Sequence, residues 1–579
     1  KRQTVKGPRN EAADLAVRAT KHLVLALENG LGMEVSKTVG GKAGKSVVLT
    51  SHVGMKARMF QAMTRLGLRF EGRERYLGVD CYGKGKRKGT STRTKRMRLM
   101  QIRAGRLRVL KKDGAKVRKV ALAGVKPSVL YGCKTMGLAD GHIRSLRRVV
   151  SSCLPGQHLG RSTTLRLAMH KADVQQECDA APIVAWSAAI WDNTMVAEEL
   201  EDAWYQQQKA VGLHRKWSKV TGPAGACIMS AARMGWSWPR YDVFKDRQGR
   251  ELRLHDVCPQ DIRAMAALDS EAAMWQRWTD QTQWVKLAPA PCVEPLRQLC
   301  NTKKQNHATK RAVEHIATIG TVTQTTLQSW GYVDSGLCQA CGKPGTPHHR
   351  FWLCSAHKHL RQQADKQYQH PGANASEDDL LYTRGLVAEK QVPFKATPEE
   401  VHWHIGPEQQ AIFGANGDVG TDGSLKHKHK AGGQCGWAVV GMQNGAPITA
   451  WGSMPADLPV QKRILRAELW AILQALRHCE PPIRIHTDCA TILQGFEKGS
   501  KVCGAAGSKH ADVWRQVWER IIDIGIGEHG VVFDKCKAHI TNAAYAALPP
   551  VKQHIAWLNR EADEWAKQGA DADQPVQWH

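Results

Sequence analysis

Four acidic residues in the last third of the chain have side chains and local settings suited to divalent-metal chemistry. Asp422 and Asp488 each follow a short stretch with strand character, Glu468 begins a stretch with helical periodicity, and Asp563 lies within a further helical stretch. Singly these are ordinary positions, because such acids usually serve as turn residues, caps or partners of the helix dipole. Gathered together they would repel one another, and such clusters are tolerated mainly where divalent cations neutralise the charge.

The elements around these acids predict one compact α/β domain. Besides the strands that end near Asp422 and Asp488, strands are expected at 434–441, 446–454 and 531–533. Helices are expected where apolar residues recur at helical spacing, at 466–476, 511–522 and 557–568. Three strands followed by alternating helices and strands, joined by right-handed crossovers, would bring Asp422 and Asp488 side by side.

The residues around the four acids resemble the four acidic motifs of type 1 RNase H: TDGS at 421–424, RAEL at 466–469, HTD at 486–488 and NREAD at 559–563. The resemblance implies an RNase H-like fold over residues 413–573, with a five-stranded mixed sheet and flanking helices. It also implies an endonuclease that cuts the RNA strand of an RNA–DNA hybrid. The implied ligands of two Mg²⁺ ions, with Mn²⁺ as an alternative, are Asp422, Glu468, Asp488 and Asp563.

Further site residues follow from the same resemblance. Ser424 and Asn559 are expected to contact nucleic acid, and His539 to assist proton transfer or product release. The stretch from 540 to 558 is longer than this loop usually is in the family, so His539 could be displaced or act as a flap, with His554 as the alternative. A DEDD exonuclease is disfavoured, because Ser424 stands where that class has Glu.

A cysteine–histidine cluster precedes this domain. The spacing of three thiolates and one imidazole suits a closed tetrahedral Zn²⁺ site, with expected ligands Cys338, Cys341, His349 and Cys354. His348, His357 and His359 are alternative ligands. The spacing also resembles the Cys-Cys-His-Cys motif that follows the reverse transcriptase in many non-LTR retrotransposon polyproteins.

Three short stretches near the start resemble parts of a non-LTR reverse transcriptase: LENGLGMEVSKT at 27–38, RYLGV at 75–79 and VLYGC at 129–133. No paired-Asp polymerase motif precedes them, so reverse transcriptase activity is not expected. The expected organisation is a truncated retroelement polyprotein. Its parts are a palm-end and thumb remnant at 1–150, a helical Trp-rich connector at 151–335, a zinc motif at 336–360, a linker at 361–412 and the RNase H domain.

Composition favours a nucleic-acid partner. Lys and Arg number 83 against 53 Asp and Glu, a net charge of +30, and residues 81–120 hold 16 basic residues against the single acid Asp113. A membrane partner is disfavoured, because no apolar run is long enough to span a bilayer. The scattered 16 Cys favour a reducing, intracellular compartment, the nucleus being one candidate. The alternative function is a catalytically inactive nucleic-acid-binding remnant of a retroelement.

Overall fold

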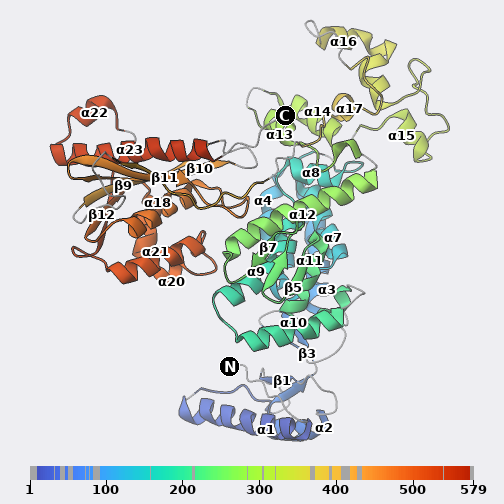
Figure 1. Ribbon diagram of the computed structural model, residues 1–579. Helices are drawn as coiled ribbons and strands as arrows, with labels where there is room; N and C mark the ends of the chain where they lie inside the picture. The colour runs from blue at the N-terminus through green and yellow to red at the C-terminus, as the bar shows by residue number, and fades with distance from the viewer. Residues whose placement is uncertain are drawn as a thin grey trace. The chain divides into compact units, whose positions relative to one another are not determined.

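The computed structural model describes residues 9–31, 33–39, 46–49, 56–71, 73–76, 79–82, 91–156, 158–211, 216–282, 285–302, 305–319, 321–364, 372–389, 394–405, 417–426, 433–538 and 540–573. Contacts within the chain divide it into two units (Figure 1), and each is described by itself. The first unit comprises Lys1–Ala185, Glu198–Met234 and Val293–Val387. The second comprises Trp186–Ala197, Gly235–Cys292 and Ala388–His579.

The first unit begins with a small α/β segment. Its helices are α1 (Arg9–Leu25) and α2 (Lys56–Arg65), and its strands are β1 (Val47–Leu49), β2 (Arg69–Glu71), β3 (Arg73–Tyr76) and β4 (Val79–Tyr82). β1 pairs with β2 in parallel, and β3 pairs with β4 antiparallel. The RYLGV stretch spans the β3–β4 connection, and its Leu77 and Gly78 lie outside the described residues.

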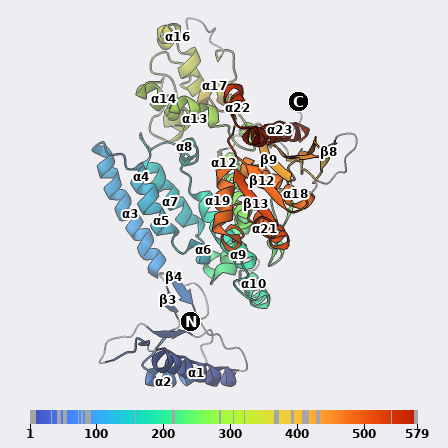
Figure 2. The ribbon, with the colours of Figure 1, turned by 90° about the vertical axis from the view of Figure 1, so that its left-hand side faces the viewer.

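Helix α3 (Ser91–Lys112) follows, and it carries much of the basic stretch. It lies along α5 (Lys126–Leu130) and α7 (Asp140–Cys153), as Figure 2 shows. Met100, Ala104 and Leu107 recur at helical spacing on its buried face. Lys95, Arg98 and Arg106 of this helix are exposed to solvent, whereas Arg93 is buried.

The rest of the first unit is helical. Its longer helices are α8 (Thr163–Met169), most of α9 (Gln175–Trp191), α10 (Ala197–Val211), α11 (Pro223–Met234), α13 (Glu294–Asn301), α14 (His307–Ala317) and α16 (Lys358–Ala364). Shorter ones are α4 (Arg118–Val120), α6 (Cys133–Met136), α15 (Gln324–Ser329) and α17 (Leu380–Arg384). No described helix of the chain combines the length and apolarity needed to cross a membrane.

The second unit is built on a six-stranded mixed sheet. Its strands are β8 (His402–Ile405), β9 (Gly417–Lys426), β10 (Gln434–Gln443), β11 (Ala446–Ser453), β12 (Ile483–Thr487) and β13 (Val531–Lys535). They lie in the order β13-β12-β9-β10-β11-β8. β13, β12 and β9 run parallel, whereas β9, β10, β11 and β8 pair antiparallel.

Helices cover both faces of this sheet (Figure 1). On one side lie α18 (Ile464–His478) and α21 (Ala511–Ile524), and on the other lies α23 (Pro550–Ala572). Short helices α19 (Ala490–Lys498), α20 (Ser500–Cys503) and α22 (Asn542–Ala546) connect them. α23 approaches β10 closely because Gly436 has no side chain: a Cβ there would collide with the backbone nitrogen of Ala570.

The second unit also contains part of the predicted connector. Strands β5 (Ser237–Arg240), β6 (Val243–Lys245) and β7 (Glu251–Arg253) form an antiparallel sheet beside α12 (Pro259–Thr282). The Trp236 indole donates to Asp269 Oδ2 at 2.6 Å, which joins this sheet to α12. The connector predicted at 151–335 is thus shared between the two units and includes strands.

The predicted mixed α/β fold at the C-terminus and the mainly helical region before it are confirmed, with two differences. The sheet has six strands rather than five, because β8 arises within the predicted linker 361–412 and pairs with β11. The last helix runs over Pro550–Ala572 rather than 557–568, so part of the long 540–558 stretch is helical.

Candidate active site

Two parallel strands place the first pair of acids. Asp422 lies within β9, and Asp488 directly follows β12. The parallel register pairs His486 with Gly420, so the chain beyond β12 continues beside the second half of β9. Asp488 is therefore brought next to Asp422 by the pairing of β12 with β9.

The third acid comes from a helix that touches the same strand. Glu468 lies in the first turns of α18, whose start packs against β9. A Cβ on Gly423 would collide with the backbone nitrogen of Glu468. The missing side chain at Gly423 is thus what lets α18 bring Glu468 beside Asp422.

Three carboxylates meet at this point. Asp422, Glu468 and Asp488 each offer an oxygen, and these oxygens all lie within 4.8 Å of one another. Asp422 and Glu468 are buried, while Asp488 is partly exposed. Among the described residues no hydrogen-bond donor reaches Glu468 Oε2, although it is buried. A group of three carboxylates that includes a buried oxygen without a hydrogen-bond donor fits a hard cation, because Mg²⁺ prefers oxygen ligands and keeps several waters.

The electrostatics agree with that fit. Burial, reinforced by Asp488 and Asp563, raises the pKa of Asp422 to about 8. Burial and the nearby charges of Asp422 and Asp488 also raise the pKa of Glu468 well above its ordinary value. Without a cation the site therefore favours bound protons, and a divalent ion would replace them.

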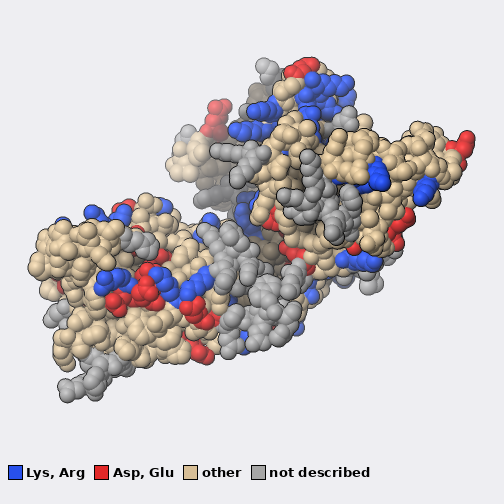
Figure 3. Space-filling model, turned by 90° about the horizontal axis from the view of Figure 1, so that it is seen from above, with Lys and Arg blue, Asp and Glu red and all other residues tan. Residues whose placement is uncertain are grey.

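Asp563 stands near this group without belonging to it. It lies on α23, and its carboxylate accepts from Lys567 Nζ at 2.8 Å. Lys567 also pairs with Glu564 at 2.9 Å. Figure 3, in which α23 faces the viewer, shows Lys and Arg side chains beside Asp and Glu on this side of the second unit. Asp563 raises the pKa of Asp422, so it acts on the site through its charge.

The remaining predicted residues of the site are placed differently from one another. Asn559 is buried on α23, and its Oδ1 accepts from the Cys536 thiol at 2.9 Å. Ser424 is partly buried on β9 opposite Gly436. His539 lies outside the described residues, and the alternative His554 stacks on Trp557 with ring centroids 6.1 Å apart. Sequence reasoning missed Cys536, because its partner lies on another element.

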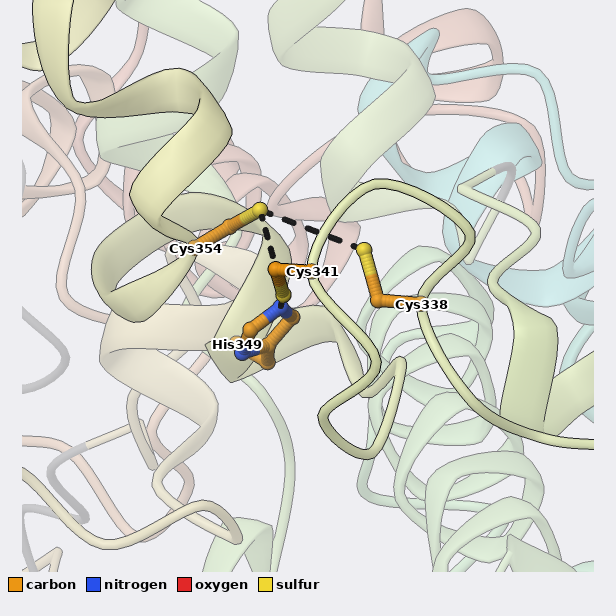
Figure 4. A group of neighbouring side chains, drawn as sticks. All are labelled: Cys338, Cys341, His349 and Cys354. Carbon is orange, nitrogen blue, oxygen red and sulfur yellow. Dashed lines mark hydrogen bonds between the residues drawn. The ribbon is translucent and has the colours of Figure 1, made fainter.

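The cysteine–histidine cluster lies in the first unit and is compact. Cys338 and Cys354 sulfurs are 3.9 Å apart, Cys354 and Cys341 sulfurs are also 3.9 Å apart, and Cys341 Sγ lies 3.1 Å from His349 Nε2 (Figure 4). The alternative His348 is turned away, because its Nε2 contacts the Gly372 carbonyl oxygen at 2.7 Å. The geometry favours His349, and the donor set of three sulfurs and one nitrogen fits Zn²⁺.

Residues 418–571 match the RNase H family. The chain is similar to the solved structure of LC9-RNase H1, a type 1 RNase H with the type 2 active-site motif, at 16% identity and a TM-score of 0.20, covering 29% of this chain and 76% of that one. It is similar to the PFV RNase H domain at 20% identity and a TM-score of 0.20, covering 27% and 93%.

It is also similar to the foamy viral protease-reverse transcriptase in complex with an RNA/DNA hybrid, at 15% identity and a TM-score of 0.20, covering 32% and 24%. No protein of curated function matches the sequence. On the strength of the family match, residues 418–571 are an RNase H domain.

Proposed function

We propose that the protein is an endoribonuclease that cleaves the RNA strand of RNA–DNA hybrids with two divalent metal ions. The observation that carries this proposal is the convergence of Asp422, Glu468 and Asp488, whose oxygens lie within 4.8 Å of one another. Asp563 would complete the ligand set by releasing Lys567. The family match of the domain supports the substrate class.

The bound ions, Mg²⁺ or Mn²⁺, would supply an activated water and stabilise the leaving 3′ oxygen of the phosphodiester. The protein's own side chains would hold the ions and orient the substrate. The carboxylates of Asp422 and Glu468 are fixed by burial, so little reorganisation is needed when ions and substrate bind. Asn559 and Ser424 would contact the hybrid, where the 2′-hydroxyl distinguishes RNA from DNA. His539 would assist proton transfer or product release.

We propose further that the chain is part of a retroelement polyprotein of the non-LTR kind. In this proposal residues 1–150 are a palm-end and thumb remnant, and their basic side chains grip nucleic acid. Cys338, Cys341, His349 and Cys354 would hold a structural Zn²⁺ with no open position for catalysis. Polymerase activity is not part of the proposal.

The test is cleavage of an end-labelled RNA–DNA hybrid by the full chain in Mg²⁺, which should yield 5′-phosphate and 3′-hydroxyl ends. Asp488→Asn and Glu468→Gln should each abolish cleavage, because each removes a carboxylate from the group of three. Asp523→Asn, which changes an exposed acid paired with Arg520, is the matched control and should cut like the parent. Equal cutting by parent and Asp488→Asn would refute the proposal, and hybrid binding without metal-dependent cutting would support the inactive binding remnant.

A further inference from the structure

Two stretches before the RNase H domain dock on it within the second unit. They are Trp186–Ala197, which includes the end of α9, and residues 258–261, which are the start of α12 and the residue before it. Both contact the segment between α20 and α21 and the start of α21. The Trp191 indole, for example, donates to the carbonyl oxygen of Gly504 at 2.8 Å. We call the two stretches together the docking segments.

The docking segments provide hydrogen-bond partners for backbone groups of the loop before α21. The Ala506 amide donates to Asp192 Oδ1 at 3.0 Å, and its carbonyl accepts from Gln260 Nε2 at 3.0 Å. The Cys258 thiol lies 3.5 Å from the carbonyl oxygen of Ser508. These bonds supply partners for backbone groups of the loop that would otherwise need water.

Burial and charge strengthen the same contact. Trp191, Cys258, Ala506 and Ala511 form one buried cluster. The Arg515 guanidinium lies 3.8 Å from the centroid of the Trp191 ring and donates to the Trp191 carbonyl oxygen at 2.9 Å. A buried Trp that stacks on a guanidinium usually contributes much of the free energy of an interface. We therefore expect Trp191 to contribute most to the binding of the docking segments.

The contact reaches the candidate metal site through one arginine. Arg466 lies two positions before Glu468, and its guanidinium donates to both carboxylate oxygens of Asp512 at 2.9 and 2.5 Å. Its Nη1 also lies 3.9 Å from Asp261 Oδ2, in the first turn of α12, which is an ionic contact too long for a hydrogen bond. Arg466 and Asp261 are both buried. The start of α18 is thus hydrogen-bonded to α21 and in ionic contact with the docking segments.

We propose that the docking segments are a positioning module of the nuclease: by fixing Arg466 they hold Glu468 at the distance from Asp422 and Asp488 that metal binding needs. Asp261 and Trp191 are the positioning residues. The inference rests on the proposed function, because it assigns Glu468 to the metal site. Metal affinity distinguishes a positioning module from a region that only adds stability. Loss of a region that is merely stabilising would leave the metal affinity of the folded protein unchanged.

The experiment uses the full chain and measures Mn²⁺ binding by electron paramagnetic resonance, without substrate, alongside hybrid cleavage. Trp191→Ala and Asp261→Ala should each weaken Mn²⁺ binding by about 10-fold, as loss of groups that orient metal ligands typically does, and should lower kcat. KM for the hybrid should stay the same. Trp191→Phe keeps a ring beneath Arg515 and should recover most of the affinity.

Two further variants keep the test decisive. Gln260→Ala removes one hydrogen bond to Ala506 but no buried ring, so the variant should fold. It should weaken Mn²⁺ binding and lower kcat, but less than Trp191→Ala does. Trp204→Ala, at a buried site on α10 of the first unit, is the control for general destabilisation and should bind Mn²⁺ like the parent. Parent-like Mn²⁺ affinity in folded Trp191→Ala and Gln260→Ala overturns the inference, even if the parent cleaves hybrid.

The two proposals fail in different ways. A parent that binds Mn²⁺ with variant-sensitive affinity but cuts no hybrid would overturn the proposed function and support the positioning module. A parent that binds no Mn²⁺ would overturn both.

Discussion

At the scale of single residues, the ionisation of Asp422 is coupled to metal binding. Burial and the charges of Asp488 and Asp563 raise the pKa of Asp422 to about 8, so the metal-free carboxyl is largely protonated at neutral pH. A divalent ion must displace that proton. We therefore expect Mg²⁺ affinity to fall as the pH drops below about 8.

Calorimetric Mg²⁺ titrations in two buffers of different ionisation enthalpy would measure this release of protons. Asp523 pairs with Arg520 and is not a candidate metal ligand, so Asp523→Asn should release as many protons on Mg²⁺ binding as the parent. Mg²⁺ affinity that stays constant from about pH 6 to about pH 9 would contradict the coupling.

Cys536 is a second residue whose role can be measured. Its thiol donates to Asn559 Oδ1 at 2.9 Å inside the domain, which orients the Asn559 amide. Cys536→Ala should raise KM for the hybrid roughly fivefold, the worth of one ordinary hydrogen bond, with little change in kcat. Cys536→Ser retains a donor and should behave like the parent. An unchanged KM in Cys536→Ala would show that Asn559 needs no such support.

At the scale of elements, a helix or strand could be predicted from the sequence where its own residues carry the pattern, but not where it depends on a distant partner. The elements that carry Asp422, Glu468 and Asp488 show periodicity and turn residues in the sequence, so their order was predictable, although Asp422 lies within β9 rather than at the predicted strand end. β8 was not, because four residues in a polar stretch become a strand only by pairing with β11. The bond from Trp191 to Gly504 joins residues 313 positions apart, a contact that no local pattern marks.

The start of α21 makes the second unit sensitive to acid. His510 precedes this helix with φ +58°, is buried, and has its pKa lowered to about 4 by burial. As the pH falls below 6.5, the ordinary pKa of histidine, His510 becomes protonated in the unfolded chain but stays neutral in the folded chain until about pH 4. The free energy of unfolding should therefore fall between pH 6.5 and about 4, by about 3 kcal/mol in all.

Urea unfolding of the full chain at a series of pH values would measure this loss. His510→Asn tolerates positive φ and does not titrate, so it should be less sensitive to acid over this range. If parent and His510→Asn lose stability in parallel, another group is responsible.

Helix α3 makes a separate prediction for nucleic-acid binding. Lys95, Arg98 and Arg106 are exposed, and among the described residues none of them has an ion-pair partner. Arg98→Glu with Arg106→Glu should weaken hybrid binding and reduce the slope of log affinity against log salt by about 1 for each phosphate that is no longer bound. Filter binding at several salt concentrations measures both. Lys209→Glu with Lys286→Glu is charge-matched, and an equal loss of affinity there would mean that only net charge matters.

At the scale of the whole molecule, the two candidate metal sites lie in different units and have different donors. The carboxylate group is in the second unit, and the cysteine–histidine cluster is in the first. Hard oxygen donors select Mg²⁺ or Mn²⁺, whereas thiolates and imidazole select Zn²⁺. The chemistry of one site should therefore not depend on the metal held by the other.

This separation can be tested with Cys338→Ser combined with Cys341→Ser. The variant should lose bound zinc, measured by elemental analysis, because two of the four ligands in the cluster are gone. Its first unit should unfold at lower temperature, since binding energy at a structural zinc site contributes to folding. Cleavage of a short hybrid in Mg²⁺ should continue at the parent rate, because Asp422, Glu468 and Asp488 are untouched. Loss of cleavage together with zinc, in a variant whose second unit still folds, would mean that the zinc motif takes part in holding the substrate.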